Sequence, residues 1–140
     1  MERVVLDSDI FSDIVEGKNE AGIARARQYQ RVFGSFTTSA ITLFEAHRGL
    51  SYKPNAERSA ALAVLKQRLN IIPIQDEEAE LGGVLHGLLK RQGTPIGEMD
   101  PIIAATALTY DLTLATANSG HYQRIIDLGY PLQLENWREM

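Results

Sequence analysis

The chain has 140 residues, with 14 basic and 18 acidic side chains and a formal net charge of −4. This length fits a single domain, expected to span residues 1–140, and 44% hydrophobic residues suffice for a core of its own. Cysteine is absent, which excludes disulfides, thiolate zinc sites and cysteine nucleophiles. No apolar run approaches the ~18 residues of a membrane span, so we expect a cytoplasmic protein with no membrane contact. The acidic balance also argues against a nucleic-acid binder that relies on charge alone.

Short apolar runs alternate with helical patterns along the chain. In chain order we expect a strand at 3–6, helices at 8–15 and 21–32, a strand at 35–38, helices at 40–50 and 55–69, a strand at 71–74, helices at 77–91 and 101–110, and strands at 112–116 and 132–134. Gly17 and Gly93 are expected to follow helix ends, whereas Ser39 and Asp76 are expected to cap helix starts.

This alternation predicts an α/β fold. Strands that are apolar on both faces, such as residues 4–6, imply a parallel sheet with helices on both sides. We therefore expect a three-layer α/β/α fold with a central, mostly parallel sheet of four to five strands. Ligand sites in such sheets form beyond the carboxyl ends of the strands. The polar residues that follow the strands are therefore the candidates for chemistry.

Carboxylates recur at these positions. The residues that follow or face the expected strand ends are Asp7, Ser8, Asp9, Glu45, Asp100, Thr116 and Asn118. Several carboxylates a few ångströms apart cannot all stay ionised without a cation. Mg²⁺ and Mn²⁺ prefer oxygen ligands, and either ion can polarise a phosphate and activate a water. The pattern predicts a metal-dependent phosphodiesterase or nuclease.

Each of these residues also has a purely structural interpretation. Asp7 is a residue type that caps helices, and Asn118 can cap the turn before His121. Asp100 precedes a proline of the kind found in a first helical turn. Glu45 lies in the middle of an expected helix, on its inward face, where capping does not explain it. An ion pair with Arg48, three residues on, is its structural alternative. The spacing leaves both interpretations open at each position.

Five segments, taken in order, resemble the motifs of PIN domains. Residues 4–10 (VVLDSDI) resemble the opening strand and its Asp-Thr/Ser-Asn signature, and residues 39–45 (SAITLFE) resemble the second motif, which ends in glutamate. Residues 96–107 (IGEMDPIIAATA) and 114–118 (LATAN) resemble the third and fourth motifs. The closing residues 134–137 (LENW) are similar to the ending of VapC toxins, the ribonucleases of type II toxin–antitoxin pairs.

The resemblance implies a PIN-like fold and a metal-dependent endoribonuclease that hydrolyses RNA, in many members of the family transfer RNA. It implies Mg²⁺ or Mn²⁺ as the cofactor, held by Asp7, Glu45 and Asp100. Ser8 matches the small hydroxyl residue beside the first acid, where it can orient a carboxylate or a water. Asn118 falls where many PIN domains have a fourth acid, so it completes the expected catalytic set and leaves open whether one or two metals bind.

Other residues near these motifs are expected to support the site. Asp9 replaces the more usual Asn of the first motif, and it either restores the charge missing at Asn118 or faces the helix start. Thr116 is expected to hold the site through hydrogen bonds, and Arg48 to contact an RNA phosphate. His121, three residues after Asn118, is interpreted as a surface or core residue rather than a catalytic one.

The resemblance also implies partners. The first is a second copy of the chain, in a homodimer. The second is a VapB-type antitoxin, whose tail covers the active-site groove. The complex binds operator DNA only through this antitoxin. The alternative is a PIN-like RNA- or protein-binding module with a weakened or inactive site, which the uncharged Asn118 favours. A haloacid-dehalogenase-type phosphatase and a receiver-like module fit less well, because the chain lacks the late acidic pair of the first and the late lysine of the second.

Overall fold

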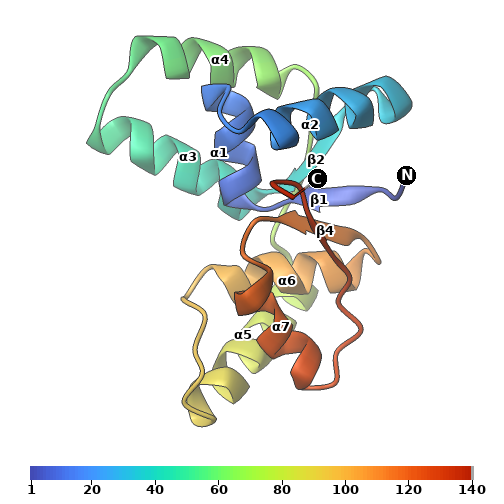
Figure 1. Cartoon of the computed structure of the whole chain (residues 1–140). Coiled ribbons are helices and arrows are strands. Elements are labelled where there is room, and N and C mark those ends of the chain that lie inside the picture. The colour runs from blue at the N-terminus through green and yellow to red at the C-terminus, as the bar shows by residue number, and fades with distance from the viewer. Residues whose placement is uncertain (140) are drawn as a thin grey trace.

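A computed structural model describes residues 1–139 and shows five parallel strands with seven helices around them (Figure 1). The strands are β1 (Val4–Leu6), β2 (Phe36–Ser39), β3 (Leu69–Ile72), β4 (Thr113–Thr116) and β5 (Leu134–Asn136). The helices are α1 (Ser8–Glu16), α2 (Glu20–Phe33), α3 (Ala40–Tyr52), α4 (Ala56–Lys66), α5 (Asp76–Arg91), α6 (Asp100–Thr109) and α7 (Ser119–Asp127). The expected α/β class with a parallel sheet is confirmed. None of the described helices combines the length and the apolar character needed to cross a membrane.

The strand order β3-β2-β1-β4-β5 places β1 at the centre of the sheet. Leu6 of β1 lies level with Thr38 of β2 and with Ala115 of β4. Because all the strands run the same way, their carboxyl ends lie at one edge of the sheet. Asp7, directly after β1, and Thr116, the last residue of β4, both lie at this edge. This carboxyl edge is where open α/β sheets bind ligands.

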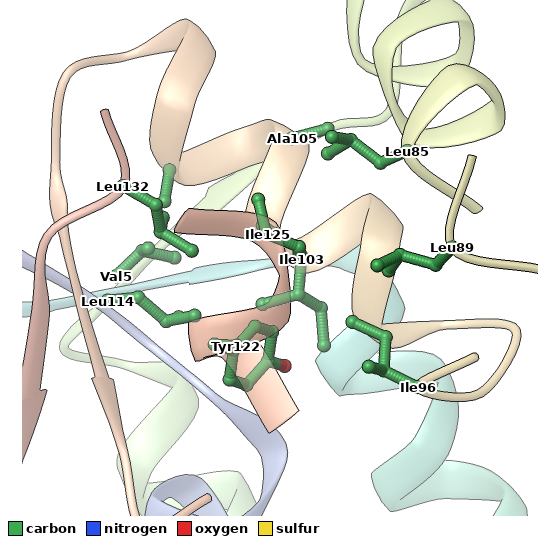
Figure 2. Close-up of a cluster of buried hydrophobic side chains, with 12 residues drawn as sticks. Val5, Leu85, Leu89, Ile96, Ile103, Ala105, Leu114, Tyr122, Ile125 and Leu132 are labelled. Carbon is green, nitrogen blue, oxygen red and sulfur yellow. The ribbon is translucent and has the colours of Figure 1, made fainter. Parts of the chain in front are cut away.

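Two apolar clusters cover opposite faces of the sheet, because successive strand side chains point to opposite sides. Val5 and Leu114 belong to the cluster that α5, α6 and α7 cover (Figure 2). Leu6 and Ala115, the next residue of each strand, belong to the cluster that α1, α2 and α4 cover. Figure 1 shows the same division, with α1 to α4 on one side of the sheet and α5 to α7 on the other. Burial on both faces explains why β1 is a continuous apolar run in the sequence.

Local side-chain chemistry sets several helix boundaries. Asp7 is the N-cap of α1 and accepts a hydrogen bond from the Ser8 N–H, and Ser39 is the N-cap of α3 and accepts one from the Thr42 N–H. Gly17 follows α1 with a φ of +66°, a left-handed conformation that residues with a Cβ rarely adopt. The expected roles of Ser39 and Gly17 are confirmed.

The boundary between α4 and β3 differs from the prediction. The helix expected at 55–69 ends at Lys66, and the strand expected at 71–74 lies at Leu69–Ile72. No glycine or proline separates the two elements. β3 is also a partly exposed strand at one edge of the sheet. Neither turn chemistry nor a continuous apolar run therefore marks this boundary in the sequence.

Three further predictions are wrong. Gln75, not Asp76, is the N-cap of α5. β5 begins later than the strand expected at 132–134. No helix was predicted between β4 and β5, where the structure has α7. Tyr122, Ile125 and Ile126 form the apolar face of α7, and their i, i+3, i+4 spacing is a helical signal that the prediction missed.

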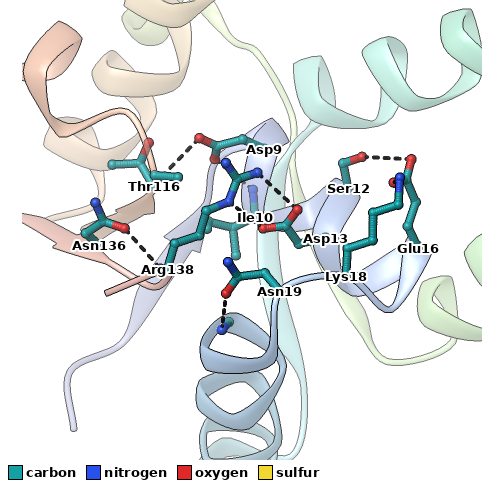
Figure 3. Close-up of polar contacts among 12 residues, drawn as sticks. Asp9, Ile10, Ser12, Asp13, Glu16, Lys18, Asn19, Thr116, Asn136 and Arg138 are labelled. Atoms are coloured by element: carbon teal, nitrogen blue, oxygen red, sulfur yellow. Dashed lines mark hydrogen bonds and ion pairs between the residues drawn. The ribbon is translucent and has the colours of Figure 1, made fainter. Parts of the chain in front are cut away.

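The chain end packs back on the first helix. Trp137 is fully buried in the cluster that α1, α2 and α4 cover. Arg138 donates two hydrogen bonds to Asp13, from Nε to Oδ2 at 2.7 Å and from Nη2 to Oδ1 at 3.0 Å (Figure 3). Bidentate pairs of this kind are among the stronger ionic contacts in proteins. They fix the segment after β5 against α1, near Asp9 at the carboxyl edge of the sheet (Figure 3).

Candidate active site

Asp7 lies directly after β1 at the carboxyl edge of the sheet. Its N–H donates to the Ala115 carbonyl at 2.9 Å, which extends the pairing of β1 with β4. Its Oδ1 accepts a hydrogen bond from the Ser8 N–H and its Oδ2 accepts one from the Thr116 hydroxyl, both at 2.8 Å. The residue is only 5% exposed. Burial, and after it the charge of Asp9, raises the pKa of Asp7 to about 7.

Thr116 links the ends of β1 and β4. Its hydroxyl donates to Asp7 and accepts a hydrogen bond from the Asn118 N–H at 2.9 Å. The hydroxyl has one proton, and this proton is directed at the Asp7 carboxylate. Thr116 therefore orients Asp7, and the hydrogen bond opposes the rise in the Asp7 pKa.

Asp9 faces both the start of α1 and the end of β4. Its Oδ1 accepts a hydrogen bond from the Ile10 N–H at 2.7 Å, and its Oδ2 accepts one from the Ala117 N–H at 3.0 Å (Figure 3). Burial raises the pKa of Asp9, whereas these two hydrogen bonds oppose the rise. Its negative charge also raises the pKa values of Asp7 and Asp100. Asp9 therefore contacts the start of α1, whereas its role in place of the charge missing at Asn118 stays a prediction.

Glu45 lies on α3 and reaches the site through Ser8. The Ser8 hydroxyl donates to Oε1 of Glu45 at 2.6 Å and lies 3.4 Å from the Thr42 hydroxyl. The other carboxylate oxygen of Glu45 is 3.7 Å from Nη2 of Arg48, whose side chain is 59% exposed. An exposed ion pair contributes little stability, so the short bond from Ser8 is the stronger restraint on Glu45.

Asp100 begins α6, and Met99 rather than Asp100 occupies the N-cap position. Its Oδ2 lies 3.9 Å from Nδ1 of His121. In the described part of the chain, the buried hydroxyl of Tyr122 has no hydrogen-bond partner. Burial, and after it the charge of Glu45, raises the pKa of Asp100, and His121 opposes the rise. Asp100 therefore faces the other acids and does not cap its helix.

Asn118 and His121 form a pair at the start of α7. Asn118 is the N-cap of α7, but its side chain makes no capping hydrogen bond. Instead its Nδ2 lies 2.9 Å from Nδ1 of His121. His121, interpreted from the sequence as a surface or core residue, lies beside the acids with 42% of its side chain exposed.

The donor atoms fit a hard divalent cation in type and charge. Asp7, Asp9, Glu45 and Asp100 present carboxylate oxygens, the ligands that Mg²⁺ and Mn²⁺ prefer. A bound cation would relieve the repulsion that, together with burial, raises the pKa values of Asp7 and Asp100. Within residues 1–139, no three His, Asp or Glu side chains converge closely enough to hold a metal ion as they stand. Asp7, Glu45 and Asp100 as metal ligands therefore stay a prediction.

Two residues near the acids were not expected from the sequence. Thr42 is buried one turn before Glu45 on α3, and its hydroxyl lies beside that of Ser8. Its three-residue spacing from Glu45 was the signal that could have identified it. Tyr122 is fully buried on α7, and burial, followed by the negative charges of Asp7 and Asp100, raises the pKa of its phenol well above the ordinary value. Tyr122 was missed because α7 was not predicted, and its helical spacing from Ile125 and Ile126 was the signal that could have identified it.

A groove of about 270 Å³ lies beside the acids, between α1, α3 and α4. Ser8 and Glu45 line it where it meets the site, and the buried side chains of Phe11 and Leu62 line it farther on. The exposed guanidinium of Arg48 also contributes to its wall. Apolar walls and a nearby cation suit a segment that carries both apolar and acidic side chains.

The chain is similar to known sequences and to a solved structure over nearly its whole length. The PIN domain family matches residues 4–125. Ribonuclease VapC1 of Haemophilus influenzae is 35% identical over 137 residues, which cover 95% of this chain and 96% of that protein. The tRNA(fMet)-specific endonuclease VapC of Shigella flexneri is 29% identical over 140 residues, which cover 98% and 99%. The crystal structure of VapBC2 from Rickettsia felis, bound to a DNA fragment from their promoter, contains a chain with a TM-score of 0.79 and 26% identity, covering 96% of this chain and 98% of that one.

Proposed function

The chain belongs to the VapC ribonucleases of the PIN domain family, and from this premise we propose that it is a metal-dependent endoribonuclease toxin that cleaves tRNA or another structured RNA. The observation that carries the proposal is the set of acids at the carboxyl edge of the sheet, where burial and neighbouring charge raise the pKa of Asp7 to about 7. Placing buried acids beside one another is costly, and such clusters are typical of functional sites. The tRNA-specific relative from Shigella flexneri supports the substrate class.

We assign Asp7, Glu45 and Asp100 as the ligands of Mg²⁺ or Mn²⁺. When bound, such a cation neutralises phosphate charge and lowers the pKa of a water. Ser8 and Thr116 donate hydrogen bonds to Glu45 and Asp7, and so hold these carboxylates in position. The bond from Thr116 also opposes the rise in the pKa of Asp7.

The remaining polar residues have distinct tasks in this proposal. Asn118 is the neutral member of the catalytic set, and it orients His121 through the contact between their side chains. Arg48 lies beside Glu45 with an exposed guanidinium, which suits a contact to an RNA phosphate next to the cleaved bond. Asp9 adds negative charge near Asp7 and Asp100 in place of the charge that Asn118 lacks.

A segment of a VapB-type antitoxin is the proposed occupant of the groove between α1, α3 and α4. An apolar residue of the antitoxin would pack against Phe11 and Leu62, and an acidic residue would pair with Arg48. The VapBC2 structure from Rickettsia felis, which includes promoter DNA, supports this partner. We also expect a homodimer in the cytoplasm that reaches operator DNA only through the antitoxin, because the chain itself is acidic.

RNA cleavage by the purified chain, free of antitoxin, tests the proposal. Transfer RNA and total RNA are incubated with the wild type in Mg²⁺, in Mn²⁺ or in EDTA. Asp100→Asn is expected to remain folded and to lose more than about 100-fold in kcat/KM, since a proposed metal ligand should matter at least as much as an outer-sphere partner. Asp111→Asn makes the same change in the turn beyond the other end of α6, and it is expected to cleave like the wild type.

Cleavage that requires the cation and is lost only in Asp100→Asn would support the proposal. Equal cleavage by Asp100→Asn and the wild type would overturn the assignment of the acids. RNA binding by the wild type with no cleavage in either metal would support the alternative, a PIN-like binding module, which the neutral Asn118 favours.

A further inference from the structure

The outward face of α3 carries two exposed aromatic side chains. Phe44 is 51% exposed and Tyr52 is 91% exposed, and neither ring belongs to the two apolar clusters that cover the sheet. The inward face of α3 instead packs against those clusters through four aliphatic residues, Ile41, Leu43, Ala46 and Leu50. An exposed ring buries little apolar area and so contributes little to the stability of the fold. The two rings therefore need an explanation other than the core.

Arg48 lies between the two rings on the same face of the helix. Phe44, Arg48 and Tyr52 follow one another at four-residue spacing, which places their side chains on neighbouring turns. The guanidinium carbon of Arg48 lies over the Phe44 ring, 5.5 Å from its centroid, within range of a cation–π contact. Eight residues of helix rise about 12 Å, so these three side chains form a stripe of about that length. We call them the α3 stripe.

Positive charge surrounds the α3 stripe. Arg48 is largely exposed, and its contact with Glu45 is long, at 3.7 Å. Lys53, the C-cap of α3, is exposed. Lys66 is exposed too, and with His47 it lines a hollow of about 280 Å³ between α3 and α4. Within residues 1–139 neither lysine forms an ion pair, so both are available to phosphates.

Unpaired RNA matches this combination of rings and cations. Its bases have free faces that stack on aromatic side chains, whereas the bases of a duplex are already stacked on one another. A stacked strand rises about 3.4 Å per nucleotide, so about three or four nucleotides would span the α3 stripe. Glu45 follows Phe44 directly and accepts the hydrogen bond from Ser8, so such a strand would lead to the acids.

Two other occupants match the α3 stripe less well. The groove assigned to the antitoxin lies between α1, α3 and α4, and neither Phe44 nor Tyr52 lines it. A second copy of the chain, placed by a two-fold axis through the stripe, would bring Arg48 and Lys53 against their own copies. Like charges that meet in this way repel each other. The positive charge therefore favours RNA over a second copy.

We propose that Phe44 and Tyr52 are stacking platforms for the bases of an unpaired segment of the RNA substrate, with Arg48 contacting a phosphate between them. This inference rests on the proposed function, to which it adds a requirement for unpaired nucleotides beside the cleaved bond. Stacking tolerates any sequence, because every base has an aromatic face. The α3 stripe thus selects unpaired RNA over duplex rather than one sequence over another.

Alanine variants of the two rings test the proposal. The probes are a labelled oligoadenylate of about ten nucleotides and the duplex that it forms with oligouridylate, bound in the Asp100→Asn background to avoid cleavage. Phe44→Ala and Tyr52→Ala should each weaken binding of the single strand about 5- to 150-fold, the loss of one stacked base. The salt dependence of binding should stay unchanged in Tyr52→Ala, since no phosphate contact is lost. The duplex is expected to bind more weakly than the single strand and to be insensitive to both changes.

Tyr110→Ala is the matched control. Tyr110 is also an exposed tyrosine, but it follows α6 at the amino ends of the strands, away from the acids. Its removal is expected to leave RNA affinity unchanged. Phe44→Trp keeps a platform, so it should bind the single strand at least as tightly as the wild type, and stacking should quench its fluorescence. Trp137 is fully buried and is not expected to contribute to the quenching.

Undiminished affinity for the single strand in either alanine variant, or no quenching in Phe44→Trp, would overturn the inference and leave the proposed function intact. Sedimentation of the same variants identifies a second copy of the chain as the occupant. If the wild type is a dimer and both alanine variants are monomers, the α3 stripe is an interface between copies and the inference is wrong. Failure of the wild type both to bind and to cleave RNA would overturn the inference together with the proposed function.

Discussion

Asp7 illustrates how burial and charge act on a single residue of the site. Its pKa is raised from 3.8 to about 7, first by burial and then by the charge of Asp9. Because the pKa is higher in the folded than in the unfolded chain, the folded state binds the Asp7 proton more tightly. The resulting stabilisation is complete below pH 3.8 and is lost as the pH rises to about 7. Relative to a neutral residue, ionised Asp7 then costs about 4 kcal/mol.

Asp7→Asn is therefore expected to stabilise the metal-free protein in alkaline solution. At about pH 8 the free energy of unfolding should rise by up to about 4 kcal/mol, and at about pH 4 it should change far less. Asparagine keeps the size of aspartate and an oxygen that can accept the Ser8 N–H bond. Urea unfolding of both proteins in EDTA at the two pH values measures the effect. A stability difference that is the same at both pH values would show that Asp7 does not titrate in this range.

The contact between α5 and α6 determines where Asp100 lies, because Asp100 is the first residue of α6. Gly82 of α5 faces the first turn of α6. A Cβ at this position would lie 3.2 Å from both Cα and Cγ1 of Ile102, which is too close for the backbone of α6 to stay in place. Gly83, the next residue, is exposed and has open space around the same position.

Gly82→Ala and Gly83→Ala are expected to have opposite effects on stability. Gly82→Ala should lower the free energy of unfolding by about 1–3 kcal/mol through overpacking, and should weaken Mn²⁺ binding by displacing Asp100. Gly83→Ala should raise it by about 0.5–1 kcal/mol, since alanine favours the helix and meets no atom. Urea unfolding and Mn²⁺ titration of both variants check these values. Stabilisation of both variants would show that α6 adjusts without strain.

The sequence predicted elements best where a local signal marks both ends. Asp7 marks the start of α1 and Gly17 marks its end. A parallel sheet also brings the residues at the carboxyl ends of its strands to one edge, regardless of the loops that connect the strands. The positions of the acids were accordingly predictable. The position of Tyr122 was not, because it depends on how α7 packs against β5 and α5, and no local pattern specifies that packing.

At the scale of the whole molecule, the net charge of −4 means that RNA phosphates approach a repulsive surface. Most of the cations near the described acids already have carboxylate partners. Arg25, Arg58 and Arg138 are paired with Glu135, Glu16 and Asp13 respectively. Arg48 has the weaker partner, a 3.7 Å contact with Glu45 that leaves most of its side chain exposed. A divalent cation bound to Glu45 would compete with Arg48 for the Glu45 carboxylate. Arg48 would then be available to contact an RNA phosphate.

Arg48→Ala is therefore expected to remove about one phosphate contact from the complex with RNA. RNA affinity is measured in the Asp100→Asn background, which avoids cleavage, at salt concentrations of about 50 to 200 mM. The slope of log affinity against log salt should fall in magnitude by about 0.7–0.9, the value for one phosphate. Arg31→Ala is the control, because Arg31 is an exposed residue near the end of α2, toward the amino ends of the strands. An equal change of slope in both variants would show that RNA responds to the charge of the molecule as a whole. A change confined to Arg48→Ala would place one phosphate beside Glu45, where the proposed chemistry requires it.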